Sequence, residues 1–150
     1  MLEPPRSADL KTKGFASDAE IAALVHAFET ATIPSSEFTH TAHIAVALSY
    51  LNEMPSEQAL KRMREKIRDF AAHHGVSNLY HETLTRFWMH LLDHVTTNYD
   101  VDLPLWRRIN LIVARWGTRR PIDAHYTREL ITSQTAREKW ILPDRLPLPF

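Results

Sequence analysis

Three histidines stand at positions where their imidazoles can act together. His40 and His43 are three residues apart and begin one apolar face of a predicted helix. His81 begins the apolar face of a later predicted helix. The residues that follow on these faces are Ile44, Ala47, Leu48 and Leu51 in the first helix and Leu84, Trp88, Leu91, Leu92 and Val95 in the second. A buried imidazole needs a partner for its polar atoms, which can be a metal ion, a carboxylate or a backbone group.

These histidines predict a metal centre between the two helices. Residues three apart on a helix have Cβ atoms about 5–6 Å apart, so His40 and His43 can reach one ion. With His81 as a third ligand, a coordination position stays open for water or substrate, as in catalytic sites. Imidazole and carboxylate ligands fit Zn, Fe, Cu or Ni, and ligand softness does not choose among them. We therefore expect a metal-dependent enzyme that acts on a small molecule.

Glu82, Arg64 and Tyr80 are predicted to complete this site as catalytic residues. Glu82 is the nearest carboxylate to His81, and it could be a fourth ligand, an acceptor for a ligating histidine, or a general acid or base. Arg64 lies beside the apolar face of its helix, and a buried arginine requires an acceptor, for which Glu82 is the candidate. Arg64 would orient Glu82 or bind an anionic substrate. Tyr80 adds a hydroxyl at a helix start whose N–H groups and dipole also attract anions.

A structural interpretation of the same residues stays open. In it His40 caps its helix, His43 forms a hydrogen bond across the core, and residues 80–83 make a hydrogen-bond network with Arg64 that holds two helices in register. The chain would then be a non-enzymatic helical domain that binds a partner or ligand. Its binding surface would be either the helix that carries Trp106 and Trp116 or an arginine-rich segment, made of Arg107, Arg108, Arg115, Arg119 and Arg120.

A metal-free enzyme is the third interpretation, with His81 and Glu82 as acid and base. The remaining pair with metal-like spacing, His90 and His94, carries less weight. At 100° per residue these two side chains point about 180° and about 220° away from His81. We therefore expect both to face solvent.

The rest of the sequence predicts an all-α single domain, a helical bundle of five main helices. Apolar spacing and breaker residues place them at about 17–31, 39–51, 57–73, 80–97 and 104–116, with shorter helices over 121–131 and 135–140. Ser17 and Glu20 form a predicted capping box at the first of them. Residues 1–16 are expected to be a flexible N-terminal arm, so the domain covers 17–150. The proline-rich end, 141–150, cannot continue a helix and is expected to lie across the bundle as an extended strap.

Composition narrows the class of partner. Eighteen basic residues balance eighteen acidic ones, which argues against a non-specific nucleic-acid binder. The chain has no cysteine, which excludes disulfides and thiolate zinc sites. No apolar run approaches the roughly 20 residues of a membrane span or forms a signal peptide, so we expect a cytoplasmic protein without a membrane partner. The expected partner is a small molecule with anionic character, and four tryptophans and an apolar tail leave a homodimer open.

Three segments carry a resemblance to a protein family. They are Phe38-Thr39-His40-Thr41-Ala42-His43, Tyr80-His81-Glu82-Thr83-Leu84-Thr85, and the stretch from Pro143 to Pro149. They resemble a family of small, uncharacterised bacterial all-helical proteins with Phe-x-His-x-x-His, Tyr-His-Glu-Thr-x-Thr and Pro-Asp-x-x-Pro-Leu-Pro segments. The likeness extends from Glu37 to Pro149 and departs at Leu79, where the family pattern has glycine. The resemblance implies that the two histidine segments act together and supplies no reaction.

Overall fold

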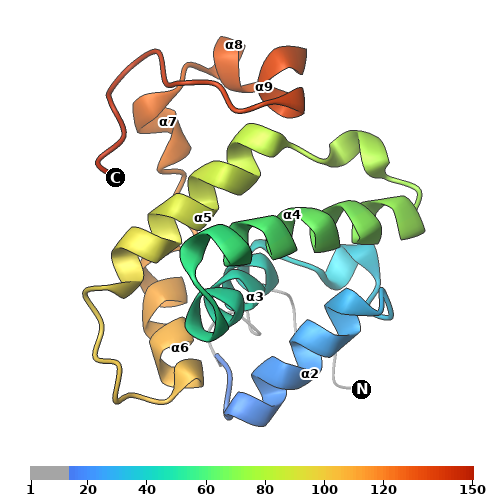
Figure 1. Cartoon of the computed structure of the whole chain (residues 1–150), viewed down its shortest axis with the longest axis vertical. Coiled ribbons are helices and arrows are strands. Elements are labelled where there is room, and N and C mark those ends of the chain that lie inside the picture. Colours follow the sequence, from blue (N-terminus) through green and yellow to red (C-terminus); the bar gives the residue numbers. More distant parts are fainter. Residues whose placement is uncertain (1–13) are drawn as a thin grey trace, which may run out of the picture.

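The computed structural model describes residues 14–150, and every regular element in this range is a helix. The main helices are α2 (Asp18–Glu29), α3 (His40–Glu53), α4 (Ser56–His73), α5 (Glu82–Thr96) and α6 (Leu105–Trp116). The shorter ones are the 3-10 helices η1 (Ser35–Glu37) and η2 (Ser77–Leu79) and the helices α7 (Ile122–His125), α8 (Arg128–Ile131) and α9 (Gln134–Glu138). The all-α prediction with five main helices is confirmed (Figure 1).

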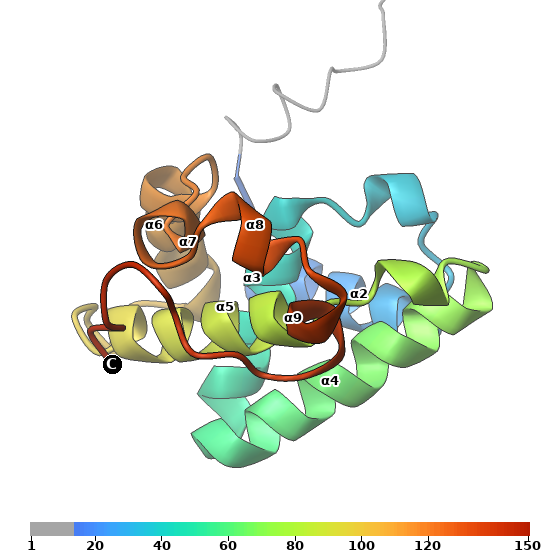
Figure 2. The same cartoon turned by 90° about the horizontal axis from the view of Figure 1, so that it is seen from above.

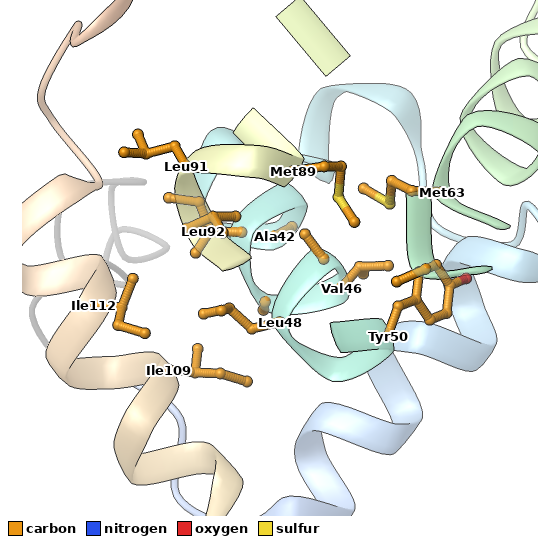
Figure 3. Close-up of a cluster of buried hydrophobic side chains, with 14 of the residues drawn as sticks. Ala42, Val46, Leu48, Tyr50, Met63, Met89, Leu91, Leu92, Ile109 and Ile112 are labelled. Carbon is orange, nitrogen blue, oxygen red and sulfur yellow. The ribbon is translucent and has the colours of Figure 1, made fainter. Parts of the chain in front are cut away.

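Helix α3 lies at the centre of the bundle and contacts α2, α4, α5 and α6. Every residue from Ile44 to Tyr50 is buried, so the helix is covered on all sides and not on one face alone. Small alanines at positions 42, 45 and 47 let the neighbouring helices approach closely. Figure 3 shows the core around α3, with Met63 of α4, Leu92 of α5 and Ile109 of α6 packed about it.

Side-chain caps set where the first two main helices begin. Ser17 Oγ accepts from the Glu20 N–H at 3.2 Å, and the Glu20 carboxylate accepts from the Ala16 N–H at 2.7 Å. The predicted start of α2 is thereby confirmed. Helix α3 is capped by Thr39, whose hydroxyl accepts from the N–H of Ala42. The interpretation in which His40 caps this helix is wrong, because Thr39 does so and His40 is the first helical residue.

The predicted N-terminal arm, residues 1–16, lies mostly outside the described residues. The part within them is tied to α6, since Phe15 N–H donates to Asn110 Oδ1 and Asn110 Nδ2 donates to the Phe15 carbonyl, each at 2.8 Å. Among residues 14–150, no helix is both long and apolar enough to pass through a membrane.

The C-terminal part of the chain runs along α5 (Figure 2). Near the start of α5, Thr83 Oγ1 donates to the carbonyl of Lys139 at 2.8 Å. At the far end, the ring of Phe150 lies 6.1 Å from that of His94. The predicted strap is confirmed, but the short helices before it number three, because Thr127 caps a separate turn.

This strap corrects the prediction that His90 faces solvent. The imidazole of His90 is half-buried, 6.0 Å from the ring of Trp140 and 6.2 Å from that of Phe150. His94 is exposed, as predicted. His90 does point away from the face of α5 that His81 begins, but the rings that cover it belong to a segment 50 to 60 residues further along the chain.

Candidate functional site

A cavity of about 210 Å³ lies between α3, α4 and α5. Its wall is mostly apolar, formed by Ile44, Ala47, Met63, Ile67, Leu79, Leu84, Trp88, Met89 and Leu92. Leu79 is 63% exposed, so the cavity meets the solvent at η2. An apolar cavity of about 150 Å³ holds a benzene molecule. This cavity therefore has room for a single ring that carries a substituent.

His40 and His43 both line this cavity from the first turn of α3. The ring of His40 meets Trp88 edge-on at 4.5 Å, and the ring of His43 lies 4.1 Å from that of Phe38. Within residues 14–150 the imidazole of His43 makes no hydrogen bond. Burial, together with the charge of a protonated His40, lowers the pKa of His43 to about 4. His43 is therefore neutral at neutral pH, with one N–H donor and one acceptor nitrogen.

His81 lines the same cavity, but both of its ring nitrogens form hydrogen bonds to backbone groups. As the residue before α5, it caps the helix, because Nδ1 accepts from the N–H of Leu84 at 3.1 Å. Its Nε2 lies 2.7 Å from the carbonyl oxygen of Ile131, so this nitrogen carries the proton and donates. Burial lowers the pKa of His81, which favours the neutral imidazole that these two hydrogen bonds require. A metal ligand needs a free lone pair, and neither ring nitrogen of His81 offers one in this arrangement.

The predicted pairing of Arg64 with Glu82 is confirmed. Arg64 Nε donates to both carboxylate oxygens of Glu82, at 2.6 and 2.9 Å, and the Tyr80 hydroxyl donates to Glu82 Oε1 at 2.9 Å. The hydrogen bond to Glu82 raises the pKa of Arg64, while burial and the same carboxylate raise the pKa of Tyr80 to about 12. Tyr80 lines the cavity, whereas Arg64 and Glu82 do not.

The structure thus brings four of the six predicted site residues to one cavity, namely His40, His43, Tyr80 and His81. It does not form the predicted three-histidine metal set. Within the described part of the chain, no group of three or more histidine, cysteine, aspartate or glutamate side chains is arranged to hold a metal ion. Two imidazoles, those of His40 and His43, remain as the polar groups that α3 presents to the cavity.

Two arginines next to this site were not anticipated from the sequence. Arg68 and Arg137 line an open pocket that shares Leu79 and Tyr80 with the cavity. Arg68 follows Arg64 by four residues, so its position on the same helix face was available as a signal. No such signal exists in the sequence for Arg137, because its position depends on how α9 packs against α5.

The arginines of the segment predicted as an alternative binding surface differ in their contacts. Arg108 Nη2 donates to Asn52 Oδ1 at 2.7 Å, Arg120 pairs with Asp123 at 3.0 Å, and Arg115 and Arg119 both lie over the ring of Trp116. Comparison with known proteins adds no support for either site. No family model, no curated protein and no solved structure matches the chain. The resemblance to the bacterial family stays a prediction.

Proposed function

We propose that this protein binds a small, mainly apolar molecule in the cavity between α3, α4 and α5, and that His43 recognises a polar group on it. The observation that carries the proposal is the state of His43, a neutral imidazole that lines the cavity and makes no hydrogen bond within residues 14–150. The partly buried ring of His43 faces the cavity, so a bound molecule would supply the hydrogen-bond partner that the described residues do not.

The apolar wall supplies most of the binding free energy in this proposal, and His43 supplies orientation. Pockets for small molecules are typically apolar with a few placed polar groups. A pKa of about 4 makes His43 a weak base, since an efficient general base has a pKa near the working pH. Recognition of a hydroxyl or carbonyl is therefore favoured over proton abstraction. The metal-free enzyme with His81 as base has less support, because both ring nitrogens of His81 already form hydrogen bonds.

Two probes of matched shape test the proposal, 4-fluorophenol and 4-fluorotoluene, followed by ¹⁹F NMR titration. We expect the wild type to bind both. In His43→Leu the affinity for the phenol should fall about fivefold relative to that for the toluene, which corresponds to the roughly 1 kcal/mol of one hydrogen bond. His90→Leu is the matched control, because His90 is a half-buried histidine outside the cavity, and it should change neither affinity. Absence of binding by both probes, or an equal loss for both in His43→Leu, would contradict the proposal.

A metal-dependent enzyme is a second candidate, with His40 and His43 as ligands and a small molecule as substrate. It is favoured by two imidazoles three residues apart on the wall of one cavity, one of them held neutral, as a metal ligand must be. The remaining ligands would be water or substrate, and Zn, Fe, Cu and Ni all suit imidazole.

Elemental analysis of tag-free protein tests this second candidate. It expects stoichiometric metal in the wild type and none in His43→Leu. The control is His94→Gln, since His94 is an exposed histidine outside the cavity that can hold adventitious metal. Metal that persists in His43→Leu and disappears in His94→Gln would count against a metal in the cavity.

A further inference from the structure

The mouth of the cavity opens beside a second pocket of different character. This outer pocket, of about 550 Å³, lies between α4, η2 and α9, and its charged residues are Arg68, Arg137 and Glu138. The two hollows share Leu79 and Tyr80 as a common wall. A molecule that fills the apolar cavity and extends past Leu79 would therefore enter a polar, cationic space.

The two guanidinium groups in the outer pocket form no ion pair with any residue from 14 to 150. Arg68 lies over the ring of Tyr80 at 4.7 Å, and Arg137 Nη1 donates to the carbonyl of Asn78 at 3.1 Å. Along the described chain neither forms an ion pair, whereas Arg62, Arg64 and Arg120 each do. The single carboxylate of the pocket, Glu138, accepts a hydrogen bond from Gln134 at 2.7 Å.

The positive charge of the outer pocket extends to the wall of the inner cavity. Burial lowers the pKa of His81, and the charge of Arg137 lowers it further. Burial raises the pKa of Tyr80, and the charge of Arg68 opposes that rise. Two arginines and one glutamate leave one net positive charge, which suits a monoanion.

We propose that the two pockets form one site for an amphipathic carboxylate, with its apolar body in the cavity and its carboxylate held by Arg68 and Arg137. The proposal rests on the proposed function and names the class of molecule. Guanidinium groups are the side chains best suited to a carboxylate, which they bind through paired hydrogen bonds. The anion site expected at the start of α5 is not formed, because Arg64 is already paired with Glu82 and His81 takes the Leu84 N–H.

Three related ¹⁹F probes separate the two pockets: 4-fluorotoluene for the cavity alone, 3-(4-fluorophenyl)propanoate for both, and 3-(4-fluorophenyl)propan-1-ol as the neutral control. We expect Arg68→Gln to weaken the propanoate about tenfold, as for one lost charge-assisted hydrogen bond, and to leave the other two probes unchanged. Arg119→Gln is the matched control, because Arg119 is an exposed arginine outside both pockets. Raising the salt concentration should weaken only the propanoate.

Arg68 is the decisive position, since its side chain makes no hydrogen bond among the described residues, whereas Arg137 also ties η2 to α9. The carboxylate site is overturned if the wild type binds 4-fluorotoluene but binds the propanoate no more tightly than the alcohol. It is also overturned if Arg68→Gln and Arg119→Gln behave alike. If 4-fluorotoluene itself does not bind, the proposed function fails, and the two failures are thereby distinct.

Discussion

The start of α5 and the start of α3 differ in how their polar side chains are hydrogen-bonded. Each places a histidine at the head of an apolar face, and both line one cavity. At α5 the polar side chains are fully used, since His81 bonds at both nitrogens and Glu82 accepts from Arg64 and Tyr80. At α3 the His43 imidazole faces the cavity and makes no hydrogen bond within the described residues. The first region holds the fold together, and the second is the one suited to a ligand.

The difference has an energetic basis. A hydrogen bond within a protein contributes about 1 kcal/mol net, but a buried polar group left without a partner costs about 1–3 kcal/mol. The network at α5 avoids that cost, whereas the partly buried ring of His43 is open to a partner from within the cavity. Substitutions at α5 should therefore lower stability, and substitutions at His43 should change binding more than stability.

The largest expected effect is at the part-buried ion pair between Arg64 of α4 and Glu82 of α5. Arg64→Met would leave the Glu82 carboxylate, 9% exposed, without its cation, and should lower the free energy of unfolding by about 3 kcal/mol. The matched control is Arg62→Met, two residues away on α4, where the arginine is 44% exposed and pairs with Glu29 at 2.9 Å. It should cost less than about 1 kcal/mol, as exposed pairs do. Urea unfolding of the two variants measures the difference, and equal losses would remove the distinction between the regions.

A smaller effect separates the two histidines directly. His81→Ala should lower the free energy of unfolding by about 2 kcal/mol, because it removes the cap of α5 and leaves the Ile131 carbonyl without its donor. His43→Leu should cost less than about 1 kcal/mol, since an apolar side chain replaces a group that has no hydrogen bond to lose. His81→Asn retains a side-chain cap and should recover part of the loss. A greater loss for His43→Leu than for His81→Ala would reverse the assignment of roles.

The sequence predicted what depends on local pattern. Apolar periodicity located the five main helices, and the need of an arginine beside a buried face for an acceptor predicted the pairing of Arg64 with Glu82. The contacts that could not be predicted depend on packing between segments that are far apart in the sequence. The partner of His81 Nε2 is the carbonyl of Ile131, 50 residues further on in a stretch of very short helices. The same stretch brings Arg137 to the mouth of the cavity and Trp140 over His90, and short helices carry little periodicity from which such contacts could be inferred.

The smallest expected effect is the contribution of His43 to the pH dependence of stability. Its pKa is about 4 in the folded protein, against about 6.5 in an unfolded chain. Between these values the unfolded state binds more protons, so protonation favours unfolding and stability falls as the pH falls. For one such group the loss between pH 7 and pH 5.5 is about 1 kcal/mol.

Other titrating groups, His81 and His90 among them, act in the same direction, because burial lowers their pKa as well. The measurement is therefore a difference: urea unfolding at pH 7 and pH 5.5 for the wild type and for His43→Leu, which removes only the His43 contribution. We expect the wild type to lose about 1 kcal/mol more than the variant over this range. An identical pH dependence in the two proteins would mean that His43 is solvated in the folded state. It would then not be the desolvated imidazole that distinguishes the cavity from the hydrogen-bonded start of α5.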